Sequence, residues 1–383
     1  MQVLSSRAAQ LRPFRTIQIL TQAKALVAKG KDIVRLDVGE PDFPTPSLVL
    51  DAASKALAEG RITYTQPTGL PELKSAIAGY YKHKYGVVID DGRIVVTTGS
   101  SAALLMIMSA IADRDSEVLG VKPGYPSYDA LARLGDARIK WIENAIDPFA
   151  WPTSGDVSHA WSPHTVGMLV ASPANPTGAV MSQDQLSEAI RATEAEGGVF
   201  ISDELYHGLS YAGEDVTACT ISDDAFVVNS FSKYFAMTGW RLGWMICPGR
   251  YRDAVETLAQ HLYLAPPFLS QWAALACFAP ETLEECERRR RELKHRRDIL
   301  LEALRGIGFE VPFEPAGGFY IFADARRWTN DSEAFCQHLL HEAGVSCAPG
   351  VDFGPFPRFV RFSFTAPMPR IKMAIARLNR TLA

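Results

Sequence analysis

The sequence predicts an α/β protein with a mainly parallel seven-stranded sheet between helices, and a smaller α+β part beside it. Three observations support this prediction. In the middle of the chain, short β-branched runs alternate with amphipathic stretches, as in strand–helix–strand units. The last third breaks the alternation with a long helical pattern, separated apolar runs and a closing amphipathic helix. A length of 383 residues also exceeds what one core usually holds.

The candidate elements follow one another along the chain. Strands are predicted at 93–98, 117–121, 138–143, 166–171, 199–202, 226–229 and 242–247. Helices are predicted at 101–112, 182–196 and 251–261, then at 281–305 and 332–343, with apolar runs at 319–323 and 359–364. The arginines within 287–297 are expected on a solvated helix face, because apolar residues recur there at helical spacing. We therefore predict a large domain at 40–285 and a small domain formed by 1–39 and 286–383.

Bulk properties exclude several function classes. A formal net charge of −4 argues against a nucleic-acid or membrane-surface partner. No uninterrupted apolar stretch is long enough to span a bilayer, and no signal-peptide pattern is present at the N-terminus. The six cysteines lack metal-ligand spacing, so we expect no metal and six small apolar side chains in a reducing, cytoplasmic compartment.

Polar and aromatic residues follow five of the predicted strands directly. These sets are Gly99-Ser100-Ser101, Tyr125, Asn175, Asp203, and Ser230 with Ser232 and Lys233. In open α/β sheets, ligands bind beyond the carboxyl ends of the strands. Scattered surface residues would not concentrate there, so the sequence predicts a ligand site at this edge.

The residue types at this edge suit pyridoxal phosphate (PLP) chemistry. The Lys233 amine can form a Schiff base with an aldehyde and later carry a proton, and Asp203 can keep a pyridine nitrogen protonated. Desolvation and the nearby Arg241 should lower the pKa of Lys233 and leave a neutral amine. Tyr206 and Asn175 can donate to a phenolic oxygen. Taken singly, Lys233 also fits a solvated surface lysine, and Asp203 also fits a helix N-cap or a turn.

A phosphate group can be held by a second set of residues. This set comprises Gly99, Ser100, Ser101, Ser230, Ser232 and Arg241. The first three open a helix, whose free N–H groups attract anions, and Arg241 offers a bidentate fork. Neither GxGxxG nor GxxxxGK[ST] occurs, which argues against a dinucleotide fold or a P-loop. A serine helix cap and a surface ion pair are the alternatives.

Two further residues can act on the cofactor or substrate. Tyr125, between prolines, offers a ring for stacking or simply makes a rigid turn. Arg361 lies in an otherwise apolar strand, where a buried arginine needs an anion. A substrate carboxylate and a structural ion pair are equally good candidates.

Together these residues resemble the class I aminotransferases, the aspartate aminotransferase superfamily of fold type I. The resemblance covers nearly the whole chain. It rests on nine ordered motifs, at 38–46, 64–69, 123–128, 172–178, 202–206, 230–243, 317–320, 348–350 and 361–363. It implies a fold type I PLP-dependent aminotransferase that moves the amino group of an L-amino acid to a 2-oxo acid by ping-pong kinetics.

The resemblance also implies a role for each matching residue. Lys233 matches the Schiff-base lysine, Asp203 the pyridine-nitrogen partner and Tyr125 the stacking residue. Arg361 matches the α-carboxylate clamp. The remaining matches are Asn175 and Tyr206 at the phenolic oxygen, Gly39 and Asn175 beside the clamp, and Gly99, Ser100, Ser101, Ser230, Ser232 and Arg241 at the phosphate. Tyr64 matches a tyrosine donated to the neighbour's phosphate site, which implies a homodimer with shared active sites.

One departure from the family pattern concerns specificity. The bacterial aspartate-specific subgroup carries a lysine, which binds the second carboxylate of aspartate, where Ser101 stands. Ile17 and the 262–264 stretch (Leu-Tyr-Leu) are candidates for an apolar side-chain pocket. We therefore expect a neutral or apolar amino donor.

Two other functions use the same fold. One is β- or γ-elimination, as in cystathionine β-lyase-like members, which the sequence separates poorly from transamination. The other is an effector-binding module of a transcription regulator. Those regulators carry an N-terminal DNA-binding domain, whereas here the enzyme-like segment begins within the first few tens of residues.

Overall fold

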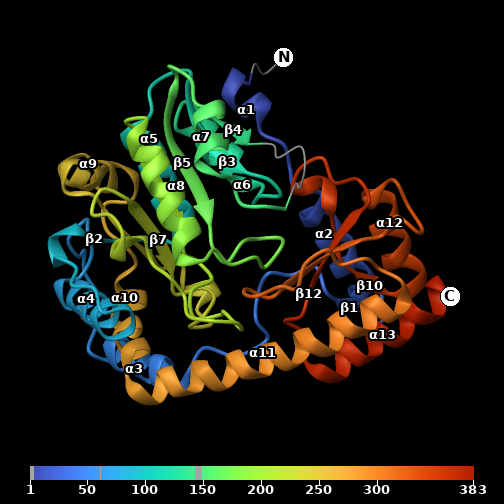
Figure 1. The fold of residues 1–383 in the computed structure, drawn as a ribbon. Helices are drawn as coiled ribbons and strands as arrows, with labels where there is room; N and C mark the ends of the chain where they lie inside the picture. The colour runs from blue at the N-terminus through green and yellow to red at the C-terminus, as the bar shows by residue number, and fades with distance from the viewer. Residues whose placement is uncertain (1–3, 61, 143–148) are drawn as a thin grey trace.

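The computed structural model describes residues 4–60, 62–142 and 149–383, and within them a large sheet is the central feature (Figure 1). Its strand order is β2-β8-β7-β6-β5-β3-β4. The strands are β2 (Ile94–Thr97), β3 (Ser116–Val121), β4 (Ala137–Ile142), β5 (Thr165–Ala171), β6 (Val199–Asp203), β7 (Phe226–Ser230) and β8 (Gly243–Ile246). β8 runs antiparallel to β2 and β7, and the other pairs are parallel. The predicted mainly parallel sheet is confirmed, although Glu143 of the strand predicted at 138–143 lies outside the described residues.

Both faces of this sheet are buried under helices. The helices around it are α3 (Ser47–Ala58), α4 (Pro71–Tyr85), α5 (Ser100–Ile111), α6 (Ser127–Leu134), α7 (Ser154–Ala160), α8 (Gln183–Ala195), α9 (Arg252–Leu262) and α10 (Phe268–Leu275). Along β2, Ile94 and Val96 pack into the cluster that contains α8, while Val95 packs into the cluster that contains α5. Successive strand residues face opposite sides, so a sheet covered twice needs the continuous apolar runs seen in the sequence.

A second set of elements comes from the two ends of the chain. β9 (Tyr320–Asp324), β11 (Ala348–Pro349) and β12 (Phe359–Ser363) form an antiparallel sheet, and β1 (Val34–Arg35) pairs with β10 (Val345–Ser346) in parallel. The helices here are α2 (Arg15–Ala28), α12 (Ser332–His338), which continues as a π-helix over Leu339–Ala343, and α13 (Met368–Leu382). The short α1 (Ser6–Gln10) precedes them. Figure 1 shows the blue α2 among red C-terminal elements, as the predicted contribution of the N-terminal segment requires.

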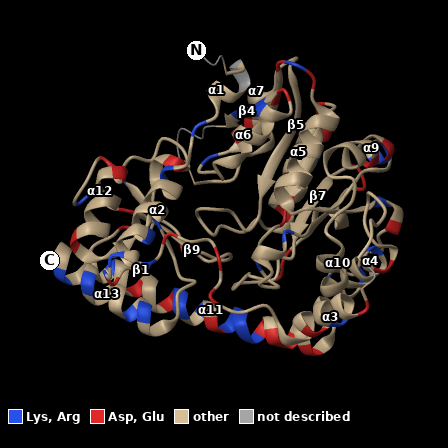
Figure 2. Ribbon diagram, turned by 180° about the vertical axis from the view of Figure 1, so that it is seen from behind, with Lys and Arg blue, Asp and Glu red and all other residues tan. Residues whose placement is uncertain are grey.

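The long helix α11 (Pro280–Ile307) runs along the base of both sets of elements (Figure 1). The predicted boundary at 285/286 falls inside this continuous helix, and the two-domain division stays a prediction. Figure 2 shows basic and acidic residues interspersed along it. The expected solvated face is wrong for three arginines: Arg289, Arg296 and Arg297 are buried. Arg296 bonds Asp42 and the Thr365 carbonyl, so it ties the helix to neighbouring loops.

The described residues include no helix that is both long and apolar enough to cross a membrane. All six cysteines are free and buried, as expected.

Candidate active site

The strand directions bring the predicted residues to one edge of the sheet. β2, β3, β5, β6 and β7 all point the same way, so their carboxyl ends meet at that edge. β8 is antiparallel, and its first residue therefore starts from the same edge. Arg241 precedes β8 and so joins residues that follow the other strands.

A cavity of about 450 Å³ opens at this edge, between the sheet and the elements from the chain ends. The predicted residues that line it are Gly39, Tyr125, Asn175, Asp203, Tyr206, Lys233 and Arg361. Ile17 and Leu20 of α2 also line it. The structure thus gathers residues that are more than 300 positions apart in the sequence into one cavity.

Lys233 follows β7 and reaches into the cavity. Its Nζ donates to the Gly39 carbonyl oxygen at 2.6 Å. Desolvation lowers the pKa of Lys233 to about 8, against an opposing contribution from Glu40, and Arg361 and Arg241 lower it further. The lowered pKa increases the fraction of this amine that is neutral near physiological pH, and the neutral form is the one that a nucleophile or base requires.

Asp203 ends β6 and is buried, 4% exposed. Burial raises the pKa of Asp203 to about 6, while hydrogen bonds lower it. The Tyr128 hydroxyl donates to Oδ2 at 2.6 Å, and the Leu205 N–H donates to Oδ1 at 3.1 Å. A desolvated carboxylate gains strongly from a cationic partner, so this position suits a protonated ring nitrogen.

The predicted phosphate residues lie beside the cavity rather than among its lining residues. Gly99 adopts φ +101° before α5, which starts without a side-chain cap, so the serine-cap alternative is wrong. A Cβ on Gly99 would lie 2.7 Å from Arg241 Nη2, so glycine lets the guanidinium approach the helix start. Ser230 Oγ lies 2.9 Å from Ser232 Oγ, which brings both hydroxyls together. Serines, an arginine and a helix N-terminus are suitable groups for a phosphate.

Arg361 lies in β12 with its guanidinium facing the cavity. Nη1 donates to Asn175 Oδ1 at 2.9 Å, and Nη2 donates to the Asp37 carbonyl oxygen at 3.0 Å. Nε is buried and has no hydrogen-bond partner among the described residues. An unpartnered buried N–H on a charged group is costly, and a bound anion would relieve that cost. No carboxylate side chain pairs with Arg361 in the hydrogen bonds and ion pairs of the described residues, so the structural ion-pair alternative has no support.

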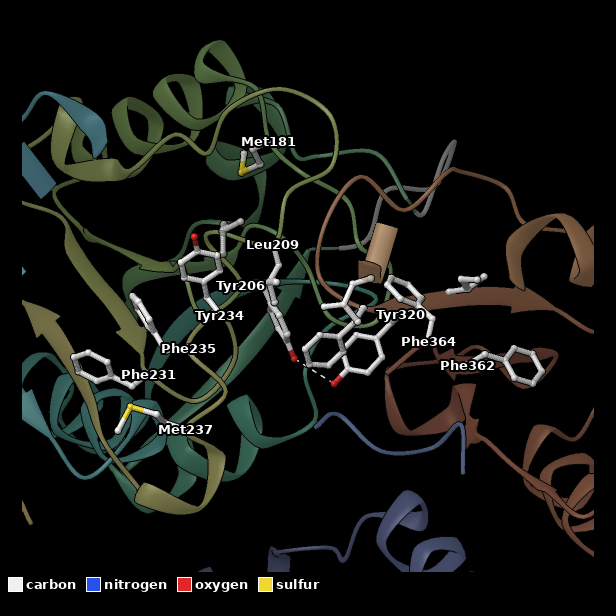
Figure 3. Packing of buried hydrophobic residues seen from close by; sticks show 14 of the residues in the cluster. Met181, Tyr206, Leu209, Phe231, Tyr234, Phe235, Met237, Tyr320, Phe362 and Phe364 are labelled. Carbon is white, nitrogen blue, oxygen red and sulfur yellow. Dashed lines mark hydrogen bonds between the residues drawn. The ribbon is translucent and has the colours of Figure 1, made fainter. Parts of the chain in front are cut away.

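Tyr206 and Tyr320 meet across the cavity wall, as the dashed line in Figure 3 shows. The Tyr206 hydroxyl donates to the Tyr320 hydroxyl at 3.2 Å. The Arg361 guanidinium lies over the Tyr320 ring at 4.0 Å. A Cβ at Gly39 would fall 2.1 Å from the Tyr320 oxygen, so no side chain fits at residue 39. Tyr320 therefore links three predicted site residues.

Some predicted residues do not join the cavity of their own chain. Tyr64 is 80% exposed, and the Ser101 side chain is also exposed. The 262–264 stretch is absent from the cavity lining, and its two leucines are each 48% exposed. The 262–264 stretch lies at the end of α9, outside the cavity. The expectation that it contributes to an apolar pocket is therefore wrong within a single chain. Ile17 does line the cavity.

Three site residues were missed from the sequence. Tyr128 stood in the motif 123–128 but received no role, although it bonds Asp203. Tyr320 likewise stood in the motif 317–320. Asp352 lines the cavity from the end of a short 3-10 helix (Gly350–Asp352) before β12, and no local pattern marks it.

Comparisons with known proteins agree with this arrangement. The family model for aminotransferase class I and II matches residues 31–378. The chain is 38% identical over 379 residues to valine–pyruvate aminotransferase of Mycobacterium tuberculosis, covering 98% of this chain and 97% of that protein. It is 33% identical over 385 residues to aspartate/prephenate aminotransferase of Thermus thermophilus, covering 100% and 99%. A crystal structure of an aminotransferase from Mycobacterium tuberculosis matches with a TM-score of 0.96 and 37% identity, covering 100% of this chain and 99% of that one.

The chain therefore belongs to the class I and II aminotransferase family and has its fold type I architecture. It is a PLP-dependent amino acid aminotransferase whose substrates are an amino acid and a 2-oxo acid. The elimination alternative is not favoured, because these relatives are named as aminotransferases.

Proposed function

We propose that the preferred amino donor is a neutral or apolar L-amino acid. One observation carries this proposal: among the described residues that line the cavity, Lys233 and Arg361 are the cationic side chains. Lys233 is the proposed partner of the cofactor and Arg361 that of the substrate α-carboxylate. A second carboxylate on the donor side chain would therefore enter the cavity without a partner charge. Burial of an unpaired charge is strongly unfavourable. Ile17 and Leu20 instead offer apolar contacts.

Lys233 is the proposed Schiff-base residue and proton carrier. Bound PLP supplies an aldehyde carbon that bonds an amine and a ring that accepts electrons. The lowered pKa of Lys233 favours the neutral form of Nζ, which would accept the proton of the substrate α-carbon and hold it for return. Asp203 is the proposed anionic partner of the ring nitrogen, and Tyr206 and Asn175 are the proposed donors to the ring oxygen.

Arg361 is the proposed clamp for the substrate α-carboxylate. Its bonds to Asn175 and to the Asp37 carbonyl fix the plane of the guanidinium, and the second N–H groups of Nη1 and Nη2 can form a bidentate pair. Gly39 lies beside this clamp, and its lack of a side chain lets the Tyr320 hydroxyl pack there. Donor and acceptor both carry an α-carboxylate, so one clamp serves each in turn, as ping-pong kinetics requires.

Around the cofactor, Tyr125 is the proposed stacking residue, and Gly99, Ser100, Ser101, Ser230, Ser232 and Arg241 form the proposed phosphate site. Tyr64 completes that site in a homodimer with shared active sites. Its 80% exposure in a single chain supports a role outside that chain. Mixing Tyr64→Phe protomers with Lys233→Ala protomers should restore activity at limiting PLP, because one site of each mixed dimer then has both native residues. An absence of any gain on mixing contradicts the shared site.

The donor proposal is tested with the purified PLP-loaded protein and single L-amino acids, without an oxo acid. Loss of the absorption band of the covalently bound cofactor, followed by stopped flow, reports the first half-reaction. L-Alanine, L-valine and L-leucine should react with higher kcat/KM than L-aspartate. L-Aspartate as the best donor by a wide margin would refute the proposal, and ammonia release with a persistent band would indicate elimination.

A further inference from the structure

Asp352 caps a helix that begins 337 positions earlier in the chain. Phe14, which precedes α2, makes no side-chain cap. Instead, Asp352 Oδ1 accepts from the Arg15 N–H at 3.1 Å, and Oδ2 accepts from the Thr16 N–H at 2.8 Å. The Thr16 hydroxyl also donates to Oδ2, at 2.6 Å. Three donors of one helical turn therefore converge on a carboxylate whose side chain is 4% exposed.

The helical turn held by Asp352 forms part of the cavity wall. Phe14, Thr16, Ile17 and Leu20 line the cavity, and Asp352 lines it as well. Ile17 is half exposed at this wall. Free N–H groups at a helix start need acceptors, and a negative charge there also interacts favourably with the helix dipole. The position of the apolar wall thus depends on Asp352.

A second contact anchors the same turn less firmly. The Arg15 guanidinium pairs with Glu333 of α12 at 2.6 Å, with both side chains 42% exposed. Exposed ion pairs contribute little because water screens them and side-chain freedom is lost. Glu333 therefore offers a matched control: it contacts the same turn, carries the same charge and bonds no backbone N–H of α2 in the described hydrogen bonds.

We propose that Asp352 is a positioning residue for donor selectivity, holding the first turn of α2 so that Ile17 and Leu20 contact the donor side chain. Asp352 acts through these residues and takes no part in proton transfer. The proposal rests on the proposed preference for neutral or apolar donors.

The test compares kcat/KM for L-alanine, L-2-aminobutyrate and L-norvaline, which differ by one methylene each. In the wild-type enzyme, kcat/KM should rise about fourfold per methylene, the value for full burial. With Asp352→Ala the rise should fall to about twofold or less, as when half of that burial is lost. Asp352→Asn, which keeps the shape and one acceptor oxygen, should lie between. Glu333→Gln should keep the wild-type rise.

Hydrogen–deuterium exchange of the holoenzyme provides a second readout. The amides of Arg15 and Thr16 should exchange at least about tenfold faster in Asp352→Asn, while those of α5 and α8 stay unchanged. An unchanged rise per methylene in both Asp352 variants overturns the proposal, as does an equal loss in Glu333→Gln. Should Asp352→Ala fail to fold, Asp352→Asn decides by the same criteria. A wild-type enzyme whose rates do not rise along the series also overturns the proposal, because Ile17 and Leu20 then do not contact the donor side chain. L-Aspartate as the best donor would instead contradict the proposed donor class.

Discussion

Replacement of Arg361 tests the substrate clamp most directly. A guanidinium has five N–H donors. Nη1 donates one hydrogen bond to Asn175, and Nη2 donates one to the Asp37 carbonyl oxygen. Nε has no partner among the described residues. The remaining donors can therefore form a fork toward the cavity. Arg361→Leu removes the fork and the charge, whereas Arg361→Lys keeps a charge that cannot bind both carboxylate oxygens in one plane.

The expected loss follows from two charge-assisted hydrogen bonds. Each is worth roughly 1.5–3 kcal/mol, so the pair is worth about 3–6 kcal/mol. At about 1.4 kcal/mol per tenfold change, kcat/KM for a neutral amino acid should fall about 10²–10⁴-fold in Arg361→Leu. Arg361→Lys should lie between this variant and the wild type.

A carboxylate-free substrate separates clamping from structural support. Single-turnover half-reactions with L-alanine and with ethylamine, which lacks the α-carboxylate, are followed by absorption of the bound cofactor. Arg361→Leu should slow the reaction of L-alanine at least about tenfold more than that of ethylamine, since each lost charge-assisted bond corresponds to a tenfold effect or more. Equal losses for both substrates, with a lowered melting temperature, would refute the clamp and assign Arg361 to holding Asn175 in place.

Three further predictions concern the cofactor and the donor. In the PLP-free protein, the pKa of Lys233 is lowered to about 8, so the neutral amine is lost as pH falls below that value. The rate of covalent PLP uptake should therefore rise about tenfold per pH unit up to about pH 8 and then level off. A plateau that begins only near pH 10 would contradict this prediction. Tyr128→Phe removes the 2.6 Å bond to Asp203, so PLP affinity measured by titration should weaken about tenfold, whereas an unchanged affinity means that this bond does not support the cofactor. Ser101→Lys adds a cation beside the site, so the ratio of kcat/KM for L-aspartate to that for L-alanine should rise about tenfold. Ser101→Met is the uncharged control, and the same rise in both variants would rule out a charge effect.

The strands could be predicted because their signal is local. Burial on both faces requires continuous apolar runs, and each predicted strand begins and ends within one residue of the described one. The sequence did not indicate that β8 inserts antiparallel between β2 and β7, because pairing depends on contacts between distant segments. That insertion explains how Arg241, which precedes a strand, reaches the edge where Lys233 follows one.

Site residues were found where a strand end or a family motif marked them, and missed where the signal lay elsewhere. Tyr128 and Tyr320 lie inside quoted motifs, but their roles depend on hydroxyl partners 75 and 114 positions away. Arg361 was found because a charge within an apolar strand is unusual. Asp352 had no such contrast, because a single aspartate in a short segment between strands is common. Only folding brings it to α2.

In the proposed assignment, the catalytic residues and the residues that select the donor come from different parts of the chain. Lys233 and Asp203 follow or end strands buried on both faces, where a shift of backbone would disturb the core as well as the reaction. The opposite wall comes from the first turn of α2 and the 3-10 helix Gly350–Asp352, which are joined by hydrogen bonds from Arg15 and Thr16 to the Asp352 carboxylate. Substitutions in that wall can change which side chain is accepted while the proton-transfer residues stay in place. Relatives named for valine, aspartate and prephenate are consistent with such variation on one fold. Substitutions in the first turn of α2 have one constraint. The turn keeps its position only if residue 352 can still accept hydrogen bonds from its N–H groups.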